Sequence, residues 1–342
     1  MIRSSNHGAR ALPEALVVVG LLAILLGLFL PGIRHLRESS ARESCRDHLR
    51  RLAAACMQAE DVHGRLPPGF RGARPGELDT DDRRTGLLVE LLPYLGRADL
   101  ATRLPSEGQW YGGDVYPPPS YAVAATRVPE FECPSAAGAR GRSALIVAAF
   151  GHDAAGAATF GRWIENYVHA EAYRPFAPSH YAGVGGAGRG PHAVASRYVG
   201  VFTDRTGVAL ADVAAGDGLS STLLIGESCG QRQNRPPEGR PSEPPDECDA
   251  NWVGVGALPT AHGLGEGTDS EWRQFGSCHA GVVQFALCDG SVRALRMGQT
   301  RRRPSGDAVW ANFGAGSSDW QLLQALAGYR DATAFDGSLF VD

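Results

Sequence analysis

The amino-acid sequence predicts an α+β protein in which one long N-terminal helix precedes a β-rich, mainly antiparallel globular head. Three observations support this fold class. An uncharged apolar segment occupies residues 15–33, apolar residues at helical spacing continue to His63, and short apolar runs separated by turn residues dominate the remainder. Because a single helix is followed by a succession of strands, the order indicates α+β rather than alternating βαβ units.

The apolar segment after Glu14 has the length of a membrane span. No charged residue occurs from Ala15 to Ile33, and about 19 residues of helix extend about 28 Å, close to the ~30 Å hydrocarbon core of a bilayer. A cleaved signal peptide would have a shorter apolar region and a small-residue cleavage site, whereas charged, helix-forming sequence follows Pro31. We therefore expect residues 14–33 to form a retained transmembrane helix with the lipid bilayer as its partner.

Residues 34–63 continue the helix as an amphipathic stem. Their apolar side chains recur at intervals of three, four or multiples of these, which places them on one stripe of a helix. The stripe consists of Leu36, Cys45, Leu49, Leu52, Cys56 and Ala59. His63-Gly64 followed by Pro67-Pro68 predicts the helix end. The expected organisation is a leader-like segment at 1–13, the span at 14–33, the stem at 34–63 and the head at 64–342.

The head reads mainly as short strands. It contributes most of the 44 Gly and 22 Pro residues of the chain, which favours many turns and loops. Alternating or continuous apolar runs bounded by Gly, Asp or Pro predict strands at residues 143–148, 198–202, 221–226, 282–287 and 291–295. Asp289-Gly290 between the last two runs is a strong hairpin signal, so we expect a hairpin at 279–295. Helices are expected at 85–95 and 320–327.

Charge and cysteine content restrict the function further. The net charge of −4 argues against a nucleic-acid partner, which would require a basic face. Seven cysteines permit disulfides outside the cytoplasm, with Cys278–Cys288 and Cys229–Cys248 as candidate pairs and at least one cysteine left over. Since no C-x2-C pair occurs, we expect no structural zinc site, no metal and no cofactor.

An enzymatic function is not predicted. Residues 226–230 match G-x-S-x-G and follow an apolar run, but a nucleophile elbow requires a helix directly after it, and the next residues are rich in Pro. No catalytic residue is assigned.

His279 and Asp289 lie at opposite ends of the expected strand at 282–287, on the order of 30 Å apart if the segment is extended. The favoured interpretation is structural: Asp289 shapes the turn, Gly290 supplies a positive φ, and His279 hydrogen-bonds a nearby loop. The alternative is that Asp217, Glu227, His279 or Asp289 bind a hard cation such as Ca2+ through oxygen ligands. No EF-hand-like spacing accompanies these residues.

Several motifs in a defined order carry a resemblance to a known family. Glu14 opens an apolar helix that reaches Pro31 and continues as an amphipathic stem, which resembles the N-terminal segment of type IV pilins and pseudopilins. His279, nine residues and Asp289-Gly290 resemble the H-x9-D-G signature of the planctomycete prepilin-like family DUF1559. The family-like positions are Cys45, Cys133, Asp217, Gly218, Glu227, His279, Asp289 and Gly290.

The resemblance implies processing by a prepilin peptidase. Counting back from Glu14 places the cut between Ala9 and Arg10. Arg10 stands where the family usually has Phe, so removal of the leader is left open.

The resemblance further implies a membrane-anchored, pseudopilin-like structural or interaction protein, held in the inner membrane with its head in the periplasm and with sister pilin-like subunits as partners. The alternative is a membrane-tethered module that binds a ligand such as a carbohydrate. The aromatic side chains that could stack on a sugar are Trp110, Tyr111, Trp163, Trp252 and Trp272.

Overall fold

The computed structural model divides the chain into two compact units, residues 1–43 and residues 44–342. The structure describes residues 8–71, 85–104, 120–136, 177–187, 197–202, 207–229, 250–267, 270–271, 274–303, 313–333 and 336–341.

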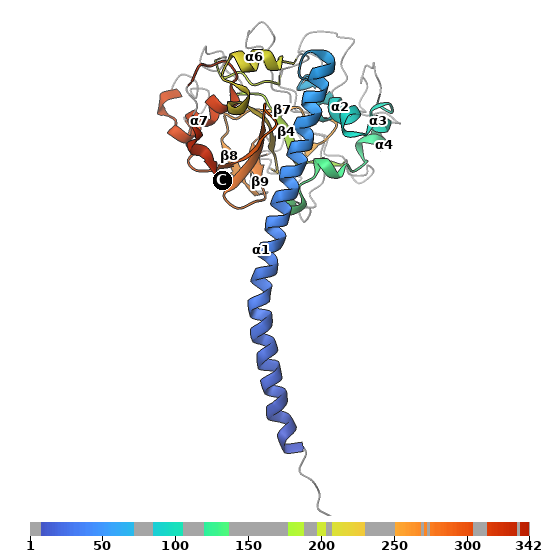
Figure 1. Cartoon of the computed structure of the whole chain (residues 1–342), viewed down its shortest axis with the longest axis vertical. Helices are drawn as coiled ribbons and strands as arrows, with labels where there is room; N and C mark the ends of the chain where they lie inside the picture. The colour runs from blue at the N-terminus through green and yellow to red at the C-terminus, as the bar shows by residue number, and fades with distance from the viewer. Residues whose placement is uncertain are drawn as a thin grey trace, which may run out of the picture. The chain divides into compact units, whose positions relative to one another are not determined.

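Helix α1 (Gly8–His63) is one continuous element (Figure 1). In the second unit its residues from Cys45 onward bury an apolar stripe of Cys45, Leu49, Leu52, Cys56 and Ala59, whereas Leu36 in the first unit is 69% exposed. The helix ends where Gly64 adopts a φ of 70° and donates its N–H to the carbonyl of Glu60. A left-handed glycine is a common helix terminator because it lacks a Cβ.

Among the described residues, no helix combines the length and the apolar character needed to cross a bilayer. The predicted transmembrane helix at residues 14–33 is therefore wrong. The prediction of a single-pass inner-membrane protein with a periplasmic head is wrong for the same reason.

The second unit is built on a six-stranded sheet with the order β12-β11-β10-β5-β4-β7. All neighbouring pairs are antiparallel except β4 and β7, so the predicted α+β class with a mainly antiparallel sheet is confirmed. The strands are β4 (Tyr181–Val184), β5 (Leu223–Glu227), β7 (Ala257–Leu258), β10 (Val282–Leu287), β11 (Val292–Arg296) and β12 (Phe340–Val341).

Short strand pairs and helices surround this sheet. The pairs are β1 (Phe70–Arg71) with β2 (Thr85–Gly86), β3 (Pro178–Ser179) with β6 (Ala250–Asn251), and β8 (Leu264–Glu266) with β9 (Phe275–Ser277). The α-helices are α2 (Leu87–Leu91), α3 (Ala98–Ala101), α4 (Ser120–Ala124), α6 (Leu210–Ala215) and α7 (Ser318–Ala327). The 3₁₀ turns are η1 (Leu92–Leu95), η2 (Pro129–Phe131), η3 (Pro134–Ala136), η4 (Leu219–Ser221), η7 (Phe313–Ala315) and η8 (Gly337–Leu339).

Most local predictions match these elements. The predicted strands at 221–226, 282–287 and 291–295 correspond to β5, β10 and β11, and the helices predicted at 85–95 and 320–327 correspond to α2 with η1 and to α7. Residues 198–202 form no named strand; Val199 and Phe202 make isolated bridges instead. The predicted strand at 143–148 lies outside the described residues.

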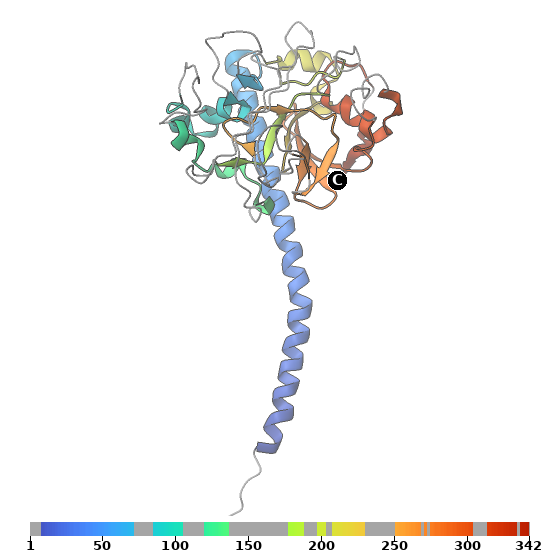
Figure 2. The ribbon, with the colours of Figure 1, turned by 180° about the vertical axis from the view of Figure 1, so that it is seen from behind.

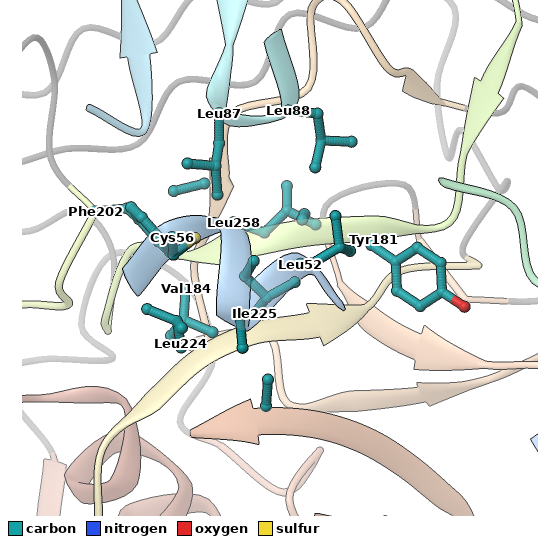
Figure 3. Close-up of a cluster of buried hydrophobic side chains, with 14 of the residues drawn as sticks. Leu52, Cys56, Leu87, Leu88, Tyr181, Val184, Phe202, Leu224, Ile225 and Leu258 are labelled. Atoms are coloured by element: carbon teal, nitrogen blue, oxygen red, sulfur yellow. The ribbon is translucent and has the colours of Figure 1, made fainter. Parts of the chain in front are cut away.

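The C-terminal part of α1 crosses one face of the sheet, in front of it in Figure 1 and behind it in Figure 2. Leu52 and Cys56 from this helix share one core with Val184 of β4 and Ile225 of β5, as Figure 3 shows. Tyr181 borders the same cluster but turns its hydroxyl away from the apolar side chains (Figure 3). Apolar packing thus joins the sheet to α1, and the Tyr181 hydroxyl is a polar group at the border of this core.

Candidate functional site: a buried cysteine, histidine and glutamate cluster

Four side chains with metal-binding atoms meet in the interior of the second unit. The Sγ atoms of Cys45 and Cys133, a carboxylate oxygen of Glu227 and a ring nitrogen of His279 all lie within 4.8 Å of one another. Their residues are 0%, 1%, 0% and 0% exposed, respectively. The site is therefore closed to solvent on all sides.

Each of the four residues comes from a different structural segment. Cys45 lies on α1, Cys133 lies between the turns η2 and η3, Glu227 ends strand β5, and His279 lies between β9 and β10. The backbone N–H of Cys133 donates to His180 Nδ1 over 3.0 Å. This bond ties the Cys133 loop to the entrance of β4, so the sheet, its neighbouring loops and the helix jointly position the cluster.

The interatomic distances describe a compact group of ligand atoms. The Cys45 thiol donates to Cys133 Sγ over 3.0 Å. His279 Nε2 lies 3.7 Å from Cys133 Sγ and 3.5 Å from Glu227 Oε1. One imidazole nitrogen thus faces both a thiol and a carboxyl group.

Glu227 is a buried carboxyl group held by the neighbouring strand. The backbone N–H of Gln284 donates to its Oε2 over 2.8 Å, and Gln284 Nε2 donates to its Oε1 over 3.3 Å. Burial, reinforced by the charge of Cys133, raises the pKa of Glu227 to about 7, while His279 and the Gln284 N–H oppose this rise. Burial thus favours the neutral form of this carboxyl, because it disfavours an uncompensated anion.

Cys133 is the thiol in the cluster that most readily becomes a thiolate. Hydrogen bonds from the thiols of Cys229 and Cys45, together with the neighbouring His279, lower its pKa. The pKa of Cys45 is raised by its hydrogen bond to Cys133 and by burial. Cys278 completes the sulfur-rich group through its interaction with Cys229. The region therefore gathers four cysteines, and the pKa is lowered for two of them, Cys133 and Cys278.

Tyr181 and His48 border the cluster on the side of α1. His48 Nδ1 lies 3.3 Å from the Tyr181 hydroxyl, and the two rings meet edge to face with centroids 6.0 Å apart. Burial is the main cause that raises the pKa of Tyr181 and lowers that of His48. Both side chains are therefore held in their neutral forms beside the thiols.

The predicted motif residues fall into two groups. Cys45, Cys133, Glu227 and His279 converge in the cluster. The turn residues stay apart from it: Asp289 accepts from the N–H and hydroxyl of Ser291, and Gly290 has a φ of 81°.

Asp217 and Gly218 also have a structural placement. Asp217 accepts the backbone N–H groups of Asp331 and Ala332, each over 2.9 Å, and Gly218 has a φ of 95°. Asp217 and Asp289 thus hold backbone turns, and the structure groups Glu227 and His279 with two cysteines rather than with these two aspartates. The side chains of Ala9, Arg10 and Glu14 lie outside the described residues.

The predicted Cys278–Cys288 disulfide does not form. Cys278 and Cys288 are both free thiols, because they lie at opposite ends of β10 rather than side by side. Cys278 instead approaches Cys229, whereas Cys288 packs into the apolar core. Cys248, the other half of the second predicted pair, lies outside the described residues.

The other candidate residues have structural environments where they are described. Trp252 is fully buried, packs on Phe131 with ring centroids 5.7 Å apart, and donates Nε1–H to the carbonyl of Thr126, so it cannot stack on a sugar. Trp110, Tyr111, Trp163 and Trp272 lie outside the described residues. Ser228 of the G-x-S-x-G sequence forms an isolated bridge with Gly276.

The cluster is not visible as a pattern of closely spaced ligand pairs in the sequence. Cys45 and Cys133 are 88 positions apart, and Cys133 and His279 are 146 positions apart. The one available signal was that all four residues belong to the family-like positions. Shared membership in a motif set could have suggested that they meet in the fold.

Comparison with known proteins identifies the family. A family model described as a protein of unknown function (DUF1559) matches residues 34–297, a range that contains all four residues of the cluster. No curated protein and no solved structure matches the chain. The chain therefore belongs to the DUF1559 family.

Proposed function

We propose that this protein is a non-catalytic structural and interaction subunit that assembles with other copies of its own chain through the N-terminal part of α1. The observation that carries the proposal is the exposed apolar surface of that part of the helix. Its large described apolar side chains between Leu16 and Leu25 are each 48–65% exposed. Contact with another apolar surface would remove this area from water, which is favourable.

The distribution of these side chains supports a helical partner. Residues 16–19 are all apolar, and four consecutive residues point in every direction around a helix with 3.6 residues per turn. A helix that is apolar all round is normally surrounded by other apolar elements. A second copy of α1 offers the same apolar surface, so the N-terminal parts of two identical helices can pack together.

Gly20 and Gly27 support close packing of such helices. They are seven positions apart, which places them on nearly the same side of the helix. A Cβ built at either position meets no atom within 4 Å. Another backbone can therefore approach closely on this side, since glycine has no side chain to block it. The resemblance of this segment to pilin stems favours the same type of assembly.

The test compares two substitutions on the same helix. Val18 is 54% exposed in the apolar part, and Val62 is 68% exposed near the helix end. The full-length chain and its Val18→Asp and Val62→Asp variants would be measured by sedimentation velocity over a range of concentrations. We expect discrete oligomers for the wild type and Val62→Asp but monomers for Val18→Asp, because a buried unpaired carboxylate is costly.

Two results would contradict the proposal. A wild-type chain that stays monomeric at tens of micromolar would show that the apolar surface does not self-associate. Equal effects of the two substitutions would show that the apolar part of α1 is not the contact. Circular dichroism of each variant would verify that the helix is retained.

A further inference from the structure

The ligand types in the buried cluster are those that hold zinc. Thiolate sulfur and imidazole nitrogen favour Zn2+ over the hard cations Ca2+ and Mg2+, and a carboxylate oxygen commonly completes a zinc site. Cys45, Cys133, His279 and Glu227 supply two sulfurs, one nitrogen and one oxygen within 4.8 Å. We propose that these four residues form a structural Zn2+ site that fastens helix α1 to the sheet.

The distances are compatible with a tetrahedral ion after a small adjustment. Zinc lies about 2.3 Å from sulfur and about 2.0–2.2 Å from nitrogen or oxygen, so neighbouring ligand atoms in a tetrahedron are roughly 3.3–3.8 Å apart. His279 Nε2 already lies at 3.7 Å from Cys133 Sγ and 3.5 Å from Glu227 Oε1. The two sulfurs, 3.0 Å apart, must separate by less than about 1 Å to bracket the ion.

Charge compensation favours occupation by a cation. The cluster places a carboxyl group and two thiols in an interior where all four residues are at most 1% exposed. Anions at such depth are expensive unless a counter-charge accompanies them. A divalent ion would allow Glu227 and both thiols to be anionic at neutral pH.

The burial of the site indicates a structural role for the ion. Structural zinc sites have four protein ligands and exclude water, whereas catalytic sites keep one position open. Here the four ligands come from α1, the loop at Cys133, β5 and the β9–β10 connection. A bound ion would therefore join segments that are distant in sequence. Cys229, which donates to Cys133 Sγ, would orient that sulfur as an outer hydrogen-bond donor.

Native mass spectrometry and elemental analysis of the purified full-length chain provide the primary test. We expect about one zinc per chain. Replacement of the zinc by Co2+ should produce the absorption bands of a tetrahedral cobalt–thiolate centre. A chelator should lower the melting temperature, and added Zn2+ but not Mg2+ should restore it, because an ion bound only by the folded state stabilises it.

Matched variants connect the ion to these residues. Cys133→Ala and His279→Gln should weaken zinc binding by about 100-fold or more, since even residues outside the ligand set affect affinity by about 10–100-fold. Cys56→Ala is the control: Cys56 is equally buried and lies on the same helix as Cys45, but it packs in the apolar core. This control should retain a full complement of zinc.

The wild-type measurements do not depend on the folding of any variant. A folded chain without stoichiometric metal, whose thiols all react in denaturant without prior reduction, would overturn the proposal. An intact mass two hydrogens lower, with Cys45 linked to Cys133, would replace the metal site by a disulfide and would also overturn it. Copper or iron in place of zinc would refute the assignment of the ion. Zinc retained by Cys133→Ala would refute the assignment of the ligands.

Discussion

Replacing Leu52 by alanine should strongly destabilise the second unit. Leu52 is fully buried where α1 meets the sheet, beside Ile225 and Tyr181 (Figure 3). The change removes three carbon atoms from the core, a transfer term of about 2.4 kcal/mol at ~0.8 kcal/mol per carbon. The remaining cavity adds to this, so the expected loss in the free energy of unfolding is about 3–4 kcal/mol.

Urea unfolding followed by tryptophan fluorescence measures this loss, because Trp252 and Trp320 are both fully buried in the second unit. The melting temperature should fall by roughly 6–12 °C, at about 2–3 °C per kcal/mol for a domain of this size. Val62→Ala is the control on the same helix, where the side chain is 68% exposed, and it should change stability by less than about 0.5 kcal/mol.

The two variants together decide whether α1 is part of the core. A loss below about 1 kcal/mol for Leu52→Ala would refute the packing of this helix on the sheet. Similar losses for both variants would show that the substitutions act through helix propensity rather than through burial.

Two further changes test the packing and electrostatics of the same unit. Gly226→Ala should cost about 1–3 kcal/mol, because its Cβ would lie 2.2 Å from Phe285 Cε1; an unchanged melting temperature by calorimetry would contradict this close contact. The pKa of Asp331 is raised by burial and by the charge of Asp217, so its folded-state pKa exceeds the unfolded value and stability falls as pH rises through it. Asp331→Asn should therefore raise the free energy of unfolding measured by urea titration at pH 7, by less than about 1 kcal/mol, but not near pH 3. An equal gain at both pH values would contradict the electrostatic cause.

Local features of the fold could be predicted from the sequence because their causes are local. The hairpin of β10 and β11 follows from two short apolar runs around Asp289-Gly290, where Asp289 binds the backbone of Ser291 and Gly290 supplies the positive φ. The amphipathic stripe of α1 likewise follows from residue spacing. Neither requires knowledge of distant segments.

The failed predictions share a different origin. Spacing alone suggested Cys278–Cys288 as a disulfide, but the strand between these residues carries them to different surroundings. Trp252 looked available for a sugar in its Gly-rich context, yet the fold buries it against Phe131. The expected membrane span relied on continuous apolar length, and no helix in the described part of the chain provides it.

The sequence by itself determined the α+β class, the long helix, the central hairpin and membership in a family of ordered motifs, because each depends on neighbouring residues or on motif order. Only the tertiary structure decided that Cys45, Cys133, Glu227 and His279 meet. Their contacts are made by the packing of α1 on one face of the sheet and of the Cys133 loop beside the start of β4. No spacing rule along the chain encodes a contact between residues 88 or 146 positions apart. The sequence identifies the four motif residues, and the tertiary structure shows that their ligand atoms lie together in the core.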